Sequence, residues 1–185
     1  MDVGISASLL TREAEPALRI EDQVIEAFDQ ARLPIYRYLV CIHITPQEAD
    51  EIIQDTFLRL FEALHSGERI SNPKGWAFRV AHNLGVNGIK GRKYVAPVSP
   101  EKWVDLVESR MDPTPGPEEL LLLKEKMGRL HAVISNLPEQ QQQCLHLRTE
   151  GFRYREIAEI LGVAIPTVAE SVRRAIGKLT LERHE

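Results

Sequence analysis

The pattern of residues 154–179 constrains this chain most, because it predicts two helices joined by a tight turn. Ile157 and Leu161 are spaced to bury one face of a first helix. Gly162 follows where the chain must turn, and glycine tolerates the left-handed backbone that ends many helices. Pro166 then stands at the start of a second helix, where its missing N–H costs nothing. We therefore predict a helix-turn-helix, a motif that docks on duplex DNA, with an ordinary helical hairpin as the alternative.

Apolar residues keep a helical period along nearly the whole chain. In the second helix of the motif they form a stripe of Val168, Val172, Ala175, Ile176 and Leu179. Patterns typical of strands are almost absent. A chain of 185 residues that is 43% hydrophobic is long enough for one or two small domains. The sequence therefore predicts an all-α protein.

Helix starts are also marked in the N-terminal half. A short helix from Ile20 is expected to end before a second one that begins at Leu33-Pro34. Thr45, Pro46 and Glu48 have the spacing of a capping box with proline in the first turn. The helix that they open aligns one broad apolar face, formed by Ala49, Ile52, Ile53, Thr56, Phe57, Leu60, Phe61 and Leu64. After a polar loop, Asn72-Pro73 opens a helix whose predicted inward residues are Trp76, Ala77, Val80, Ala81 and Leu84.

Composition shifts divide the chain into four segments. Residues 1–19 are weakly patterned and are expected to be a loose extension, and residues 20–93 form a first helical domain. Residues 94–117 are rich in proline and predict a flexible linker. Residues 118–185 form a second helical domain that contains the helix-turn-helix.

Charge is unevenly distributed although the net charge is only −4. Residues 44–70 carry six acidic side chains against two basic ones, whereas residues 71–93 carry five basic side chains and no acidic one. Two neighbouring surfaces of opposite charge suggest two partners, one of them polyanionic. Two solvated faces without a partner are the alternative.

Several other classes of protein are disfavoured by the sequence. No apolar run approaches the length of a membrane span, and the N-terminus lacks the layout of a signal peptide. Cys41 and Cys144 lie in apolar helical patterns and are expected to be buried thiols in the cytoplasm. The six histidines form no metal-binding spacing, and no nucleophile or phosphate-binding loop is recognisable. We expect neither an enzyme nor a metal or cofactor.

Three segments together resemble bacterial RNA polymerase sigma factors of the sigma-70 family, of the small extracytoplasmic-function (ECF) type. Residues 48–59 look like region 2.2, residues 72–84 like regions 2.3 and 2.4, and residues 137–179 like region 4. They occur in the order and spacing of the family. The resemblance implies a non-catalytic subunit that recognises promoters and aids strand opening. A stand-alone helix-turn-helix regulator with an N-terminal sensor or dimerisation domain is the alternative.

The resemblance implies roles for three sets of residues. Binding of the polymerase core at its β′ clamp helices is assigned to region 2.2, at Asp50, Glu51, Gln54, Asp55, Arg59 and Glu62. The β flap is a further part of the core that is expected as a partner. Contacts with the −10 promoter element are assigned to Lys74, Arg79, His82, Asn83, Asn87, Lys90, Arg92 and Lys93. Contacts with the −35 element are assigned to Pro166, Thr167, Ala169, Glu170, Arg173, Arg174 and Lys178. Such factors are commonly held inactive by an anti-sigma protein, which is therefore a further expected partner.

This chain departs from the family at two points. Ala169, Glu170 and Ser171 stand where a basic residue and small polar ones are usual, and Asn87 replaces a usual aspartate. A carboxylate at Glu170 can accept a hydrogen bond from a cytosine amino group, but it repels phosphates. These departures leave two alternatives open, an atypical promoter or weak DNA binding that depends on the polymerase.

Overall fold

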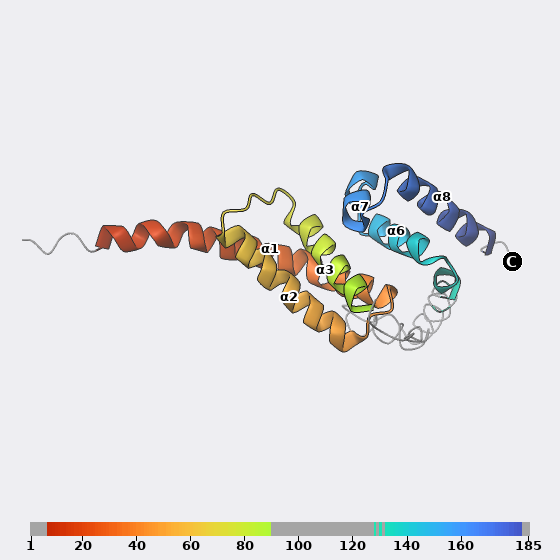
Figure 1. The fold of residues 1–185 in the computed structure, drawn as a ribbon, viewed down its shortest axis with the longest axis horizontal. Helices are drawn as coiled ribbons and strands as arrows, with labels where there is room; N and C mark the ends of the chain where they lie inside the picture. Colours follow the sequence, from red (N-terminus) through yellow and green to blue (C-terminus); the bar gives the residue numbers. More distant parts are fainter. Residues whose placement is uncertain (1–6, 90–127, 129, 131, 183–185) are drawn as a thin grey trace, which may run out of the picture. The chain divides into compact units, whose positions relative to one another are not determined.

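The computed structural model describes residues 7–89, 128, 130 and 132–182. Figure 1 labels the helices that these residues form: α1 (Ala7–Cys41), α2 (Pro46–His65), α3 (Pro73–Ile89), α6 (Glu139–Thr149), α7 (Tyr154–Leu161) and α8 (Ile165–Glu182). No strand occurs in this part of the chain, which confirms the predicted all-α class. None of the helices described is both long and apolar enough to cross a bilayer. The predicted linker lies outside the described residues.

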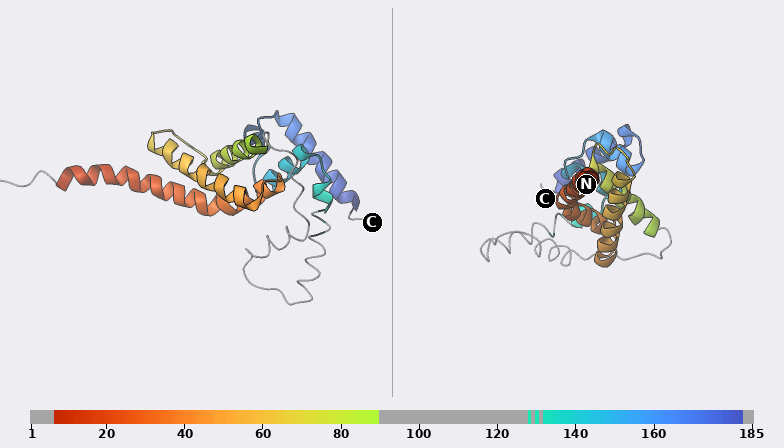
Figure 2. Two further views of the ribbon diagram at one scale, coloured as in Figure 1. Left: turned by 60° about the horizontal axis from the view of Figure 1, so that its bottom comes forward. Right: turned by 90° about the vertical axis from the view of Figure 1, so that its left-hand side faces the viewer.

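The helices belong to two compact units. The first contains α1 up to Leu39, α2 and α3, and the second contains α6, α7 and α8. In the first unit, α2 and α3 lie side by side, as the views of Figures 1 and 2 both show. In the second unit, α8 packs against both α6 and α7.

Helix α1 is longer than the sequence predicted. It runs without interruption from Ala7, so the expected loose extension is wrong from that residue on, and so is the expected break at Leu33-Pro34. Residues 7–19 are mostly Ala, Leu, Glu and Arg, which are strong helix formers. A proline inside a helix costs about 3 kcal/mol, but Ile35 and other neighbours are fully buried, and each large buried apolar side chain contributes about 1.5–3 kcal/mol.

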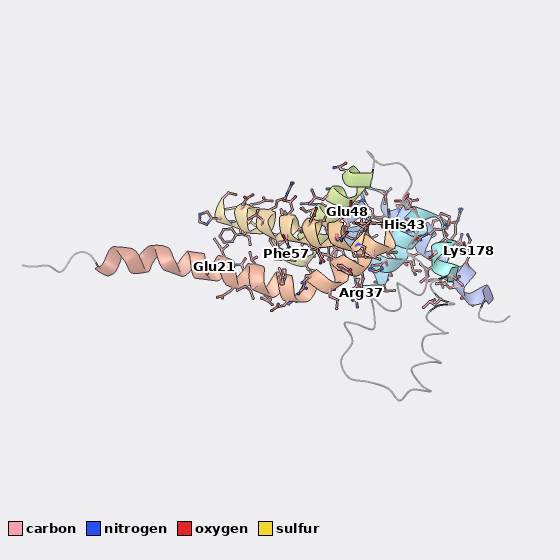
Figure 3. The ribbon with its side chains drawn as sticks, turned by 90° about the horizontal axis from the view of Figure 1, so that it is seen from below. Glu21, Arg37, His43, Glu48, Phe57 and Lys178 are labelled. Carbon is pink, nitrogen blue, oxygen red and sulfur yellow. The ribbon has the colours of Figure 1, made fainter. Side chains whose placement is uncertain are left out.

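Aromatic contacts join α1 to the other two helices of the first unit. The Phe28 ring meets the Phe57 ring of α2 edge-on, with 5.0 Å between the ring centroids, and Phe57 is labelled in Figure 3. The Tyr38 ring is tilted against the Phe78 ring of α3, with 6.0 Å between the ring centroids. Both Tyr38 and Phe78 are fully buried. These rings form the centre of the first unit.

The predicted start and apolar face of α2 are confirmed. The backbone N–H and the hydroxyl of Thr45 donate hydrogen bonds to the Glu48 carboxylate, at 3.2 and 2.7 Å. Ile52 and Phe61 are half-buried. The rest of the predicted face is buried: Ala49, Ile53, Thr56, Phe57, Leu60 and Leu64.

Helix α3 begins as predicted but is rotated relative to the expected orientation. Asn72 Oδ1 accepts a hydrogen bond of 2.9 Å from the Gly75 N–H, which caps the helix. Phe78 and His82 are buried together with Ala77 and Ala81, whereas the predicted inward residues Trp76, Val80 and Leu84 are only half-buried. The cause is the contact with Tyr38 of α1, which draws Phe78 and His82 inward.

The second unit confirms the helix-turn-helix. Gly162 ends α7 with φ at +66°, in the left-handed region, and the N–H of Val163 donates to the Ala158 carbonyl at 3.1 Å. Helix α8 begins at Ile165, one residue before Pro166, so the proline lies in the first turn, where its N–H is not needed. Ile176 is 51% exposed, so its assignment to the apolar stripe is wrong.

The core of the second unit lies where its three helices meet. Its most deeply buried side chains are Cys144, Leu147, Ile157, Val168, Val172 and Ala175. Burial raises the pKa of the Cys144 thiol, against a smaller opposite effect of its hydrogen bond with Ser171. Cys144 is therefore the buried thiol that the sequence predicts, whereas Cys41 is only half-buried.

Candidate protein and nucleic-acid interfaces

The outward face of α2 carries the residues assigned to polymerase binding. Asp50, Glu51, Gln54, Arg59 and Glu62 are exposed, and Asp55 is half-buried. Asp55 Oδ1 lies 3.0 Å from Arg59 Nε, so one carboxylate of this face is engaged by a cation of the same helix. With four carboxylates and one guanidinium, the face is net acidic. The structure thus brings all six predicted residues onto one helix.

Leu58 is a surface residue of α2 that the sequence analysis missed. It is 57% exposed and is spaced four residues from both Gln54 and Glu62, inside the acidic face. An exposed leucine surrounded by charged residues has the composition of an interface centre with a polar rim. The sequence does contain a signal for it, because Leu58 is an apolar residue that does not fit the helical spacing of the buried face of α2.

The outward face of α3 is polar and nearly uncharged. Arg79, Asn83 and Asn87 are exposed and lie four residues apart, so they form one row along the helix. Lys74 is half-buried. Lys90, Arg92 and Lys93, also predicted to bind DNA, lie outside the described residues. The row can offer one guanidinium and two amides to a nucleic acid.

His82 is not placed to contact DNA, which corrects the prediction. Only 8% of it is exposed, and its Nδ1 lies 2.7 Å from the Tyr38 hydroxyl, within the core of the first unit. Burial lowers the pKa of the His82 imidazole, so the neutral form is favoured. Its role is to satisfy a buried tyrosine.

The first turns of α8 present most of the residues assigned to the −35 element. Pro166, Arg173, Arg174 and Lys178 are exposed, whereas Thr167, Ala169 and Glu170 are half-buried. Ser171, one of the departures from the family pattern, is buried and faces Cys144. It is therefore part of the packing and not of the outward surface.

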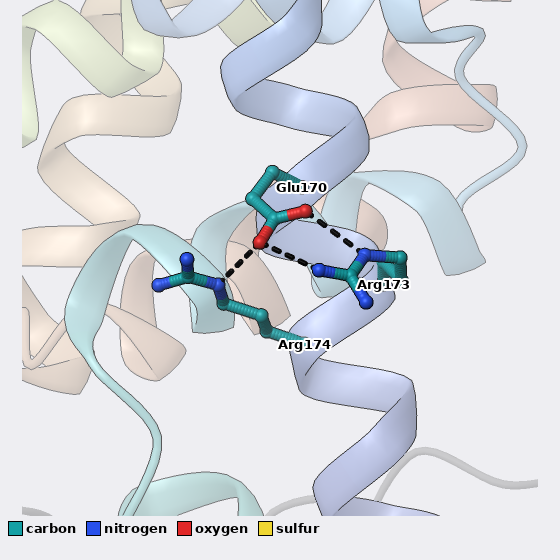
Figure 4. Close-up of polar contacts among 3 residues, drawn as sticks. All are labelled: Glu170, Arg173 and Arg174. Atoms are coloured by element: carbon teal, nitrogen blue, oxygen red, sulfur yellow. Dashed lines mark hydrogen bonds and ion pairs between the residues drawn. The ribbon is translucent and has the colours of Figure 1, made fainter.

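Glu170 engages two arginines of the same helix (Figure 4). Its carboxylate accepts two hydrogen bonds from Arg173, at 2.9 Å from Nε and 2.8 Å from Nη2, and one from Arg174 Nε at 2.6 Å. These bonds lower the pKa of Glu170, so the carboxylate stays ionised. The three side chains together have one net positive charge rather than two.

A groove runs between the start of α6 and the first half of α8. It is lined by Pro138, Gln140, Gln141, Pro166, Thr167, Glu170, Ser171 and Arg174. Of the two arginines held by Glu170, Arg174 lines this groove. Figure 4 shows them on opposite sides of the Glu170 carboxylate.

A helix-turn-helix with an arginine-bearing second helix, on a chain that also has an acidic and a polar helix face, defines a DNA-binding transcription protein. Comparison with known families makes this specific. The model of sigma-70 region 2 matches residues 27–94, and that of sigma-70 region 4 matches residues 127–179. The chain belongs to the sigma-70 family of RNA polymerase sigma factors, in its ECF group.

Curated relatives support this assignment over most of the chain. The ECF RNA polymerase sigma factor EcfG of Rhodopseudomonas palustris is 25% identical over 162 residues, which cover 87% of this chain and 83% of the relative. The ECF RNA polymerase sigma-E factor of Escherichia coli K12 is 28% identical, with 74% of each chain covered.

Two solved structures have a similar fold. CnrH, in complex with the cytosolic domain of CnrY, has a TM-score of 0.58 at 16% identity and covers 92% of this chain and 94% of its own. RpoE of Bartonella quintana, in complex with the anti-sigma factor NepR, has a TM-score of 0.54 at 23% identity and covers 80% and 89%.

Proposed function

We propose that this sigma factor binds the polymerase core through the outward face of α2 and contacts promoter DNA through α3 and α8. The observation that carries the proposal is that two helices of the first unit expose different kinds of side chain. Helix α2 exposes carboxylates around Leu58, and α3 exposes a polar row with a single arginine. The acidic face of α2 suits a basic protein surface, and the polar row of α3 suits DNA.

The contact with the core would combine charge with an apolar centre. Asp50, Glu51 and Glu62 are exposed and attract a basic partner surface, which mainly sets association rate and register. Leu58 would supply the desolvated centre, where a few residues carry most of the binding energy.

The contact with the −10 element would favour separated strands. Asn83 and Asn87 offer amides that can bond to the edges of unpaired bases, and Arg79 can bind a phosphate. The factor itself performs no covalent chemistry in this proposal. RNA synthesis is catalysed by the polymerase core. In this proposal the factor acts in the cytoplasm, where the promoter is.

The direct test is transcription from a promoter library by core polymerase with the purified full chain. We expect promoter-dependent initiation with the wild type and none with core alone. Arg79→Ala should weaken initiation at all promoters, because one phosphate contact is lost. The plot of the logarithm of the DNA-binding constant against the logarithm of the salt concentration should also become less steep, by about one in its slope. No initiation at any promoter, together with no complex with core, would contradict the proposal and favour a stand-alone regulator.

We also propose that an anti-sigma protein regulates this factor. The support is that RpoE of Bartonella quintana, similar in fold, was solved in complex with the anti-sigma factor NepR. Because α2 carries the proposed polymerase surface, such a partner would act by covering it. Competition between that partner and core polymerase, measured with the purified proteins, tests the idea, and simultaneous binding of both would contradict it.

A further inference from the structure

Glu170 lies on the DNA-facing helix, where a carboxylate is unfavourable near phosphates. The structure nevertheless gives it well-formed bonds with Arg173 and Arg174, in two different arrangements. Arg173 binds it with Nε and Nη2 together, a two-point contact that fixes the plane of the guanidinium. Arg174 uses Nε alone and lines the groove beside α6.

The bonding pattern leaves a defined part of Arg173 for DNA. A guanidinium has five N–H groups, and the two bonds to Glu170 use one on Nε and one on Nη2. The remaining hydrogens of Nη1 and Nη2 form the outer edge of the group. That edge is the fork that pairs with O6 and N7 of guanine in the major groove. The side chain of Arg173 is 74% exposed, so the edge is accessible.

We propose that Glu170 is a positioning residue that holds Arg173 for recognition of a guanine in the −35 element. This inference rests on the proposed function, because it assumes that α8 enters the major groove of the promoter. Glu170 acts through Arg173, and Arg174, which leaves on the groove side, binds a phosphate. The carboxylate therefore increases sequence selectivity at the expense of overall attraction to DNA.

This role predicts opposite changes in two quantities that a purely structural ion pair would not separate. Removing the charge of Glu170 frees two arginines, so average affinity for DNA should rise or stay equal. The freed Arg173 can adopt many rotamers, so the preference for guanine should fall. A residue that served only helix stability would leave the preference unchanged.

The experiment measures binding of the complex of core polymerase and full-length factor to a library in which every position of the −35 element is varied. The variants are Arg173→Ala, the isosteric Glu170→Gln, and Glu159→Gln as a matched control. Glu159 forms an exposed ion pair of the same kind with Arg155, at 3.2 Å, but on α7. Thermal unfolding of each variant checks that the fold is intact.

We expect the wild type to prefer guanine at one position by roughly tenfold, as a two-point arginine contact provides. Arg173→Ala should abolish that preference, Glu170→Gln should reduce it at the same position without loss of average affinity, and Glu159→Gln should match the wild type. An unchanged preference in Glu170→Gln overturns the inference. A preference lost at a different base pair from that of Arg173→Ala also overturns it, because Glu170 would then contact a base itself. If the wild type initiates transcription but shows no guanine preference, only this inference fails, whereas no complex with core contradicts the proposed function.

Discussion

The two units of this protein distribute charge on their surfaces in different ways. In the first unit each helix carries mainly one kind of exposed group, because α2 has four carboxylates with a single arginine, Arg59, and α3 exposes a row with one arginine and two asparagines. In the second unit both signs occur on α8, where Glu170 binds Arg173 and Arg174. Different exposed groups on different helices suit two partners with one surface each. Paired charge suits selective contact with a single polyanion, because it fixes side-chain geometry and lowers non-specific attraction.

The largest expected effect is at the centre of the acidic face. Leu58→Asp would place a carboxylate at the proposed centre of the contact with core, so we expect affinity for core polymerase to fall at least roughly tenfold. Equilibrium binding to core in the absence of DNA measures this. Ile25→Asp is the matched control, since Ile25 is 59% exposed on α1 and should change affinity little. Equal losses of affinity for core in both variants would contradict the assignment of core binding to the acidic face of α2.

An intermediate effect concerns the turn that places α8. Gly162 has φ at +66° with open space around it, so Gly162→Ala should lower the free energy of unfolding by about 1–2 kcal/mol through backbone strain alone. Gly177 lies within α8, also in open space, and Gly177→Ala should raise stability by about 0.5–1 kcal/mol. Urea unfolding of the full chain compares the two. The same sign for both substitutions would contradict the assigned backbone geometry.

The smallest effect is a pH dependence of the first unit. Because burial lowers the pKa of His82 below its ordinary value of 6.5, the unfolded state binds more protons at mildly acidic pH. The contribution of His82 to stability is therefore complete above 6.5 and is lost progressively as the pH falls from there toward the lowered folded value. His82→Gln keeps a hydrogen-bonding group beside Tyr38 but does not titrate. Its unfolding midpoint should vary less with pH between about 7 and 5 than that of the wild type.

The sequence predicted most of the helix boundaries because they depend on local chemistry. The cap at Thr45, the cap at Asn72 and the turn at Gly162 each follow from neighbouring residues alone, and all three are confirmed. The predicted helix boundary at Leu33-Pro34 is wrong because it also rests on neighbouring residues alone. Local rules end a helix there, but burial of neighbouring side chains, which depends on distant parts of the chain, keeps α1 continuous.

The candidate surfaces were less predictable because they depend on which side of a helix is covered. Apolar spacing alone could not show that Tyr38 draws His82 inward, so a buried histidine was assigned to DNA. Leu58 was overlooked because an exposed leucine adds nothing to an apolar period. The bonds of Glu170 could have been predicted from the sequence, because Arg173 and Arg174 follow it by three and four residues, the spacing at which side chains of a helix meet.

The central claim is that the acidic face of α2 binds the polymerase core, and charge reversal tests it most directly. Glu51→Lys and Glu159→Lys change the net charge equally, but only Glu51 lies on that face, and both glutamates are exposed. In low salt and without DNA, we expect Glu51→Lys to weaken binding to core by roughly tenfold, a difference that shrinks as salt screens the charges. Glu159→Lys should stay within about twofold of the wild type, as exposed positions outside an interface do. Equal affinities of the two variants would contradict the account.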